Sequence, residues 1–261
     1  MHRRPRPTSS SAVDLRTDRY PRASAYDPTW ILDNLTGPNP LWLTEALVEA
    51  MALSPGMRVL DIGRGRALSS IFLAKEFGAQ VWATDLWTPA SHNWQRIRAA
   101  GVDHLVVPLR AEAHRLPFAD DFFDAIVSID AYHYWGTDDR YLADTFAPLV
   151  ARGGQIGIVV PALTEELDTV PPHLLPTFAD LLSNGFHSPS WWRDHWVRST
   201  VVEVTCAEAL DDGPEIWARS AELRTQHLRA QGQQVDDMEQ TLLRADAGKT
   251  LTMARIVAHR R

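Results

Sequence analysis

The sequence predicts an α/β fold in which helices cover both faces of a mostly parallel, doubly wound β-sheet. Between residues 57 and 161, short apolar segments alternate with helical stretches, which is the pattern of parallel strands joined by crossover helices. The first apolar segment ends in a glycine-rich turn, Gly63-Arg64-Gly65, of the kind that joins a strand to a helix around a ligand. Apolar residues make up 45% of the 261 residues, which suffices for a sizeable core.

The chain begins with a segment whose composition differs from the rest. Residues 1–25 are rich in Arg, Ser and Pro and lack the apolar middle region of a signal peptide. We expect a disordered basic tail over residues 1–25 and the folded domain over residues 26–261. A basic arm that contacts a nucleic acid or a protein partner is the alternative for the tail.

The elements of the domain follow in order. Asn39-Pro40 begins the first helix, since Asn is a good N-cap and Pro suits the first helical position, and Ser54-Pro55-Gly56 ends it. Further helices are predicted at residues 67–77, 91–100, 139–150 and 189–198, the last capped by Ser188. Strands are predicted at residues 57–62, 80–85, 104–109, 123–130, 155–161, 200–206 and 250–259.

Two segments interrupt this alternation. Residues 162–187 follow the fifth strand, and residues 207–248 follow the sixth. If those strands run parallel to the others, both segments leave the sheet at its carboxyl edge, where open α/β sheets bind ligands. We therefore expect helical lid insertions over a substrate.

Composition excludes several classes of function. The formal net charge of −7 opposes a nucleic-acid partner. The longest strongly apolar stretch, Ile156 to Leu163, is far shorter than the ~20 residues that cross a bilayer. Cys206 is the only cysteine, which fits a reducing, cytoplasmic compartment. The ten histidines show no metal-binding spacing, so no metal site is expected, and a homodimer is left open.

The glycine-rich turn points away from a dinucleotide. A dinucleotide-binding turn needs a third glycine at the position of Leu68, and Asp61 just before the turn would repel a pyrophosphate. A carboxylate at this point favours a cationic ligand instead. Asp61, Gly63 and Gly65 therefore predict a site for a nucleoside that carries positive charge.

Acidic residues also follow the next two strands. Asp85 ends the second strand, where a carboxylate can accept hydrogen bonds from two ribose hydroxyls. Glu112, beside Ala113 after the third strand, could accept a hydrogen bond from an adenine amino group, while Leu86 or Trp87 covers the base.

These motifs resemble those of the Rossmann-like (class I) S-adenosylmethionine-dependent methyltransferases from about Met57 to Pro161. The family's acid-x-Gly-x-Gly turn is matched at Asp61, Gly63 and Gly65, and the acid of its second strand at Asp85. Its pattern Asp-Ala…Leu-Pro-Phe-x-Asp…Phe-Asp is matched from Glu112 to Asp124, and its Gly-Gly before the fifth strand at Gly153-Gly154. The resemblance implies seven strands with the last antiparallel at the sheet edge, S-adenosylmethionine as cofactor, and a small-molecule acceptor.

The sequence departs from the family pattern inside the turn. Ala67 replaces the third glycine, which is tolerable if its φ stays negative. Arg64 and Arg66 lie beside a cationic cofactor, so either they point to solvent or one of them binds the methionine carboxylate.

The fourth strand leads into candidate acceptor residues, which the resemblance places beside the transferable methyl group. His133 is the first candidate for a general base, with a purely structural histidine as the alternative. Tyr132 or Tyr134 could bind the acceptor or simply pack. Asp130 is expected to contact the ammonium of the cofactor.

Two further segments carry weaker expectations. Trp191, Trp192, His195 and Trp196 form a broad aromatic face on the helix at 189–198, which either packs on the sheet or lines a substrate pocket. His187 is a second candidate base, and Asn34 could touch the cofactor.

The leading hypothesis is methyl transfer to an O, N or C atom of a small metabolite. The alternatives are a non-methylating enzyme on the same scaffold, such as a cyclase that uses the cofactor's charge, and a binding protein with a vestigial site.

Overall fold

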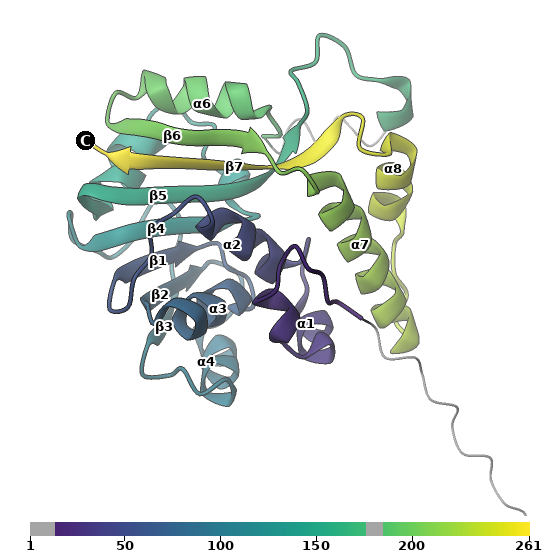
Figure 1. The fold of residues 1–261 in the computed structure, drawn as a ribbon, viewed down its shortest axis with the longest axis horizontal. Helices are drawn as coiled ribbons and strands as arrows, with labels where there is room; N and C mark the ends of the chain where they lie inside the picture. The colour runs from purple at the N-terminus through teal and green to yellow at the C-terminus, as the bar shows by residue number, and fades with distance from the viewer. Residues whose placement is uncertain (1–13, 176–184) are drawn as a thin grey trace, which may run out of the picture.

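A sheet of seven strands forms the centre of the molecule (Figure 1). The structure is a computed structural model and describes residues 14–175 and 185–261. The strands are β1 (Arg58–Ile62), β2 (Gln80–Asp85), β3 (Val106–Arg110), β4 (Phe123–Ile129), β5 (Val150–Leu163), β6 (Val202–Ala209) and β7 (Leu251–Arg260). Their order is β3-β2-β1-β4-β5-β7-β6, and β7 runs antiparallel to the six others. The predicted fold class is therefore confirmed.

The position of β7 differs from the expectation drawn from the family resemblance. β7 does not lie at the sheet edge, because it pairs with β5 on one side and with β6 on the other. The outermost strand is β6, which has β7 as its neighbour in the sheet. The antiparallel direction was predicted correctly and the edge position was wrong.

Helices cover both faces of the sheet, as a doubly wound fold requires. They are α1 (Pro28–Asn34), α2 (Pro40–Val48), α3 (Leu68–Phe77), α4 (Ala90–Ala99), α6 (Pro189–Arg198), α7 (Gly213–Ala230) and α8 (Met238–Asp246). One hydrophobic core lies on the sheet face that carries Val59 and Val81. It is completed by helices α1, α2, α3, α4, α7 and α8. The other joins α6 to the face that carries Leu60 and Ile156. Successive residues of β1 thus enter different cores, as the alternation of a strand dictates.

Two predicted helix caps are present. The Asn39 side chain accepts a hydrogen bond from the Leu41 amide at 3.0 Å, and α2 begins at Pro40. The Ser188 hydroxyl accepts one from the Trp191 amide at 3.2 Å, and α6 begins at Pro189. Both caps satisfy amide groups that have no partner inside the helix.

The helix predicted at residues 139–150 is irregular instead. A π-helical turn at Leu142–Phe146 (η3) passes into a 3₁₀ turn at Ala147–Leu149 (η4). Pro148 cannot donate a backbone hydrogen bond and so prevents a regular helix there. β5 then begins at Val150, five residues before its predicted start at residue 155.

The folded domain begins earlier than composition predicts. Leu15 and Tyr20 are buried in the core, although both belong to the segment expected as a tail. The Tyr20 hydroxyl donates to Asp212 at 2.7 Å, and the Ala23 amide donates to Glu45 at 2.7 Å. The expected tail is therefore wrong for residues 14–25, and its residues 1–13 lie outside the described part.

The two segments expected as lids begin within strands. β5 continues to Leu163, and β6 continues to Ala209. The first segment then contains a 3₁₀ turn, η5 (Pro172–Leu174), and its residues 176–184 are outside the described part. The second forms α7 and α8, which lie beside one another at one end of the sheet (Figure 1). Within the described ranges, no helix combines the length and the apolar character that crossing a membrane demands.

Candidate active site

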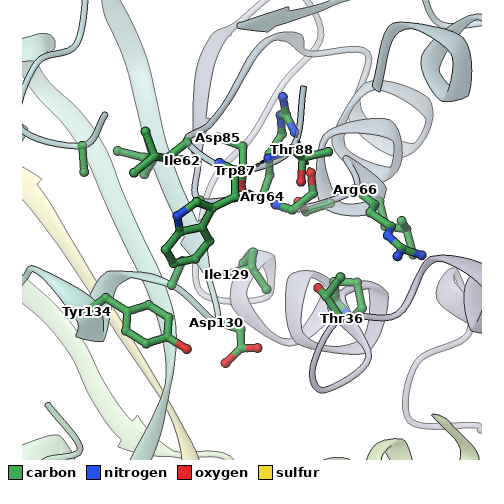
Figure 2. Close-up of a pocket in the computed structure, with 18 of the residues that line it drawn as sticks. Thr36, Ile62, Arg64, Arg66, Asp85, Trp87, Thr88, Ile129, Asp130 and Tyr134 are labelled. Atoms are coloured by element: carbon green, nitrogen blue, oxygen red, sulfur yellow. Dashed lines mark hydrogen bonds between the residues drawn. The ribbon is translucent and has the colours of Figure 1, made fainter. Parts of the chain in front are cut away.

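A cavity of about 420 Å³ opens where the strand order reverses between β1 and β4 (Figure 2). This is the switch point at which open α/β sheets bind ligands, and the volume is typical of a small-molecule site. Five segments contribute to its wall, within residues 34–40, 62–69, 85–88, 111–113 and 129–135.

The turn after β1 needs glycine for both conformation and space. Gly63 and Gly65 have φ values of +71° and +53°. A Cβ atom on Gly63 would lie 2.4 Å from the side chain of Ala131 and 2.9 Å from the ring of Trp135. The turn therefore packs directly against the segment that follows β4, and side chains are excluded there.

Asp85 organises the turn from the end of β2. One carboxylate oxygen accepts the Gly65 amide at 2.8 Å, and the other accepts the amides of Trp87 and Thr88 at 2.9 and 2.7 Å. Asp85 is 6% exposed and lines the cavity, as predicted for a ribose-binding acid. Its two oxygens offer about four lone-pair sites, so one site remains for a ligand hydroxyl.

Asp61 does not line the cavity. It is fully buried beneath the turn, where one oxygen accepts the hydroxyls of Ser69 and Ser70 at 2.6 and 2.5 Å. Burial raises the pKa of this carboxyl, and the two serine hydrogen bonds oppose that effect. The side chain anchors the first turn of α3, so the expected direct contact with a ligand is not supported.

Arg64 is buried rather than solvated. It is 5% exposed, and its Nη1 donates to the Gly65 carbonyl at 2.8 Å. Its Nε and Nη2 have no hydrogen-bond partner among the described residues. Burial lowers the pKa of the guanidinium to about 10, although the charges of Asp61 and Asp85 oppose this. Of the two interpretations left open for Arg64, solvent exposure is excluded.

The other two departures are also placed. Arg66 donates to the Asp33 carbonyl at 2.7 Å and so connects the turn to the last turn of α1. Ala67 has a φ of +65°, so the condition of a negative φ is not met. A left-handed alanine is strained by roughly 1–2 kcal/mol. A glycine, which the family pattern has at this position, would adopt the same conformation without that strain.

The part of the wall that follows Asp85 is more exposed to solvent than the turn. Leu86 and Trp87 are 42% and 77% exposed, and the Trp87 ring lies edge-on to that of Tyr134, 6.4 Å away (Figure 2). Glu112 and Ala113 also line the cavity. A hydrogen bond from His114 at 2.7 Å lowers the pKa of Glu112, which keeps its carboxylate ionised.

The three candidates after β4 point in different directions, because they form a 3₁₀ turn, η2 (Tyr132–Tyr134). Tyr134 lines the cavity, whereas Tyr132 is fully buried among Trp192 and Trp196. His133 is 3% exposed and packs against Phe186, and burial lowers its pKa to about 3. Neither Tyr132 nor His133 lies at the cavity wall, so the structure does not support them as catalytic groups.

Residues from the end of α1 and from the loop after it complete the wall. Asn34, the last residue of α1, lines the cavity, and so does Thr36. Arg96 donates to the Asn34 side chain at 2.7 Å, and Arg224 of α7 donates to the Thr36 carbonyl at 2.9 Å. Sequence reasoning did not find Thr36 or Trp135, because nothing local signals that these segments meet at the cavity.

The aromatic face of α6 belongs to the core. Trp192 and Trp196 are fully buried in the cluster around Tyr132, and neither lines the cavity. His187 stacks on Trp191 at 3.6 Å and lies 3.2 Å from Glu166, away from the cavity wall. The packing interpretation is therefore confirmed for α6.

The sequence from residue 60 to 158 matches the family model described as a methyltransferase domain. The methyltransferase GfsG of Streptomyces halstedii is 30% identical over 144 residues, which cover 53% of this chain and 50% of that protein. The chain spans about half or less of the length of the curated relatives it matches.

Two solved structures share the fold. The geranyl diphosphate C-methyltransferase of Streptomyces coelicolor, solved with Mg²⁺, geranyl diphosphate and S-adenosylhomocysteine, gives a TM-score of 0.64 at 17% identity and covers 84% of this chain and 76% of that one. The [4+2]-cyclase SpnF gives 0.64 at 16% identity and covers 87% and 84%. Residues 60–158 therefore resemble a methyltransferase domain, and the whole chain shares its fold with these solved structures.

Proposed function

We propose that this protein transfers a methyl group from S-adenosylmethionine to a small-molecule acceptor. The observation that carries the proposal is Asp85, a carboxylate pinned by three backbone amides at the rim of a cavity beside a glycine turn. The remaining lone-pair site of this fixed acceptor suits a hydroxyl of a ribose. The exposed faces of Leu86 and Trp87 suit an adenine ring, and Glu112 suits its amino group.

The buried polar atoms near the turn also fit this cofactor. Arg64 lines the cavity with two unpartnered guanidinium nitrogens, and leaving buried donors unpaired is costly. A carboxylate such as that of a methionine moiety would satisfy them. The cofactor supplies a methyl group already activated on a sulfonium, so the protein needs mainly to align the acceptor and exclude water.

The acceptor would lie at the Tyr134 side of the cavity. The wall there is made by residues 129–135 and by the loop that Arg224 of α7 holds. A cavity of about 420 Å³ suits a metabolite rather than a polymer, and the net charge of −7 disfavours a nucleic acid. The single cysteine supports a reducing, cytoplasmic location.

Titration calorimetry of the purified chain tests cofactor binding. We expect S-adenosylmethionine and S-adenosylhomocysteine to bind with micromolar affinity and NAD⁺ not to bind. Incubation with S-adenosylmethionine and pooled metabolites should then release S-adenosylhomocysteine and give products heavier by one methylene. Failure of both cofactor forms to bind would refute the proposal. Binding without a methylated product would favour the cyclase-like alternative, and the [4+2]-cyclase SpnF has the same fold as this chain.

A further inference from the structure

Asp130, expected from the sequence to contact the ammonium of the cofactor, is a carboxyl group in the wall of the cavity. It follows the last residue of β4, and its amide donates to the Val159 carbonyl at 2.8 Å, so β5 fixes its backbone. Its φ is +55°, a left-handed conformation that costs a residue other than glycine some stability. Figure 2 shows its carboxyl group on the same side of the cavity as the Tyr134 hydroxyl. The surrounding structure maintains this strained conformation, and the residue lines the cavity.

The carboxyl group is tightly placed but has no donor. A Cβ atom on Gly37 would lie 2.3 Å from its Oδ2, so the loop after α1 packs directly on it. Among the residues that the structure describes, none donates a hydrogen bond to either carboxyl oxygen. The contrast with Asp85, whose two oxygens accept three amides, is complete. A partly buried carboxyl group without a donor is available to a ligand.

The surroundings place the ionisation of this carboxyl group slightly above neutral pH, so it is mostly protonated at pH 7 and can accept a proton above about pH 8. Burial raises the pKa of Asp130 to about 8, the charge of Glu239 raises it further, and that of Arg224 lowers it. Glu239 belongs to α8 and Arg224 to α7, so Asp130 lies on the side of the cavity that faces these helices. The pKa of Tyr134 is raised by burial and by the charges of Asp130 and Glu239, which keeps its hydroxyl protonated.

Asp85 and Asp130 thus lie on different sides of the cavity (Figure 2). The charges of Asp85 and of Asp61, which is buried outside the cavity wall, act on Arg64. The charges of Asp130 and of Glu239, which is also outside the cavity wall, act on Tyr134. With the ribose on Asp85 and the methionine carboxylate on Arg64, as proposed above, Asp130 remains for the acceptor.

We propose that Asp130, beside Tyr134, selects an amine acceptor and takes the proton that a primary or secondary ammonium must lose before it can be methylated. The inference rests on the proposed function and names the substrate class of the same site. In this step one N–H bond breaks, its electron pair stays on nitrogen as the lone pair, and the proton forms an O–H bond on the Asp130 carboxylate. The Tyr134 hydroxyl is placed to accept a second N–H of the same group, and an acceptor with an acid near its reacting atom would be repelled.

Ligand preference tests the inference without any turnover. Benzylamine and benzyl alcohol are titrated at pH 8.5, above the pKa of Asp130, into the full chain saturated with S-adenosylhomocysteine. The wild-type protein should bind benzylamine about tenfold more tightly, because a hydrogen bond to a charged group is worth more than one to a neutral group. Asp130→Asn should abolish this preference and leave S-adenosylhomocysteine affinity within about twofold, since asparagine also tolerates the left-handed conformation.

Each other outcome decides against the inference. Benzylamine that binds no better than benzyl alcohol, or does not bind, overturns it, and so does an Asp130→Asn variant that keeps the preference. If the variant instead loses affinity for S-adenosylhomocysteine, Asp130 serves the cofactor's ammonium. Asp103→Asn, an exposed site with the same charge change, is the matched control. A wild-type chain that does not bind S-adenosylhomocysteine refutes the proposed function itself, which the titration with that compound alone reveals.

Discussion

The two ends of the cavity are built on different principles. At the turn, Asp85 already accepts three amides and the glycines already pack against the neighbouring strand, so the binding groups are positioned before any ligand arrives. At the other end, Asp130 has no donor among the described residues, and Tyr134 is 55% exposed. The turn is therefore suited to a single cofactor, whereas the Asp130 end is suited to an acceptor that supplies the missing hydrogen-bond donor.

The largest effect is expected from Asp85→Ala. The change removes the acceptor of three amides and the proposed partner of the ribose, so S-adenosylmethionine affinity should fall about a hundredfold. Titration calorimetry measures this loss, with Asp103→Asn as the control at an exposed site. A folded Asp85→Ala variant with unchanged affinity for S-adenosylmethionine would show that Asp85 does not bind the cofactor.

A second effect concerns the buried His133. Its pKa is about 3 in the folded state, against about 6.5 when unfolded, so the unfolded state binds the proton first as the pH falls. The stabilisation is complete above pH ~6.5 and is lost progressively as the pH drops toward 3. Between pH 7.5 and pH 5, this histidine should therefore lower the free energy of unfolding by about 2 kcal/mol.

Urea unfolding at the two pH values measures that loss. His133→Leu should flatten the pH dependence, whereas His104→Leu at an exposed site should leave it as in the wild type. If His133→Leu retains the full dependence, the ring is not the neutral packing group that its position beside Phe186 implies. Such a result would return it to the candidates for catalysis.

A smaller effect is expected at the open rim. Trp87→Ala removes a 77% exposed ring that lies edge-on to Tyr134, so the free energy of unfolding should change by less than about 0.5 kcal/mol. S-adenosylmethionine affinity should nevertheless fall about tenfold, because an aromatic surface over the base is lost. Trp94→Ala, a partly exposed tryptophan of α4 outside the cavity, is the control. Equal losses in the two variants would remove Trp87 from the binding surface.

The smallest effect tests backbone strain away from the site. Ala247 ends α8 with a φ of +49° and is exposed, so it gains little from its methyl group. Ala247→Gly should raise the free energy of unfolding by about 1 kcal/mol in urea denaturation. Gly248→Ala, at a φ of +72°, should lower it by a similar amount. Opposite signs would contradict the backbone conformation at this helix end.

Most of the parallel sheet could be predicted because each strand carries its own signal. The apolar runs of β1 and β2 and the caps at Asn39 and Ser188 are local features, and they were found at or within a residue of their place. The irregular turn before β5 was missed because a single proline, Pro148, outweighed an otherwise helical pattern. The place of β7 was missed because pairing between distant strands is not encoded in either strand alone.

The site divides in the same way. Asp85, Glu112 and the two glycines were predicted from their spacing along strand ends, and the structure places them at one cavity. The direction of a side chain within η2 was not predictable, since one residue of rotation separates Tyr134 in the wall from His133 in the core. The direction of the Asp61 side chain was also not predicted. Side chains alternate along β1, so Ile62 faces the cavity and Asp61 faces the other side of the sheet.

The hydrogen bond between Tyr20 and Asp212 joins the start of the described chain to the start of α7. α7 in turn holds the loop over the cavity through Arg224 and Thr36. A protein that begins at residue 26, as composition alone would suggest, would lack the Tyr20 hydrogen bond to Asp212. It should bind its ligands less tightly, although all seven strands would be retained. Choosing where to trim the amino terminus is consequently a decision about the catalytic pocket.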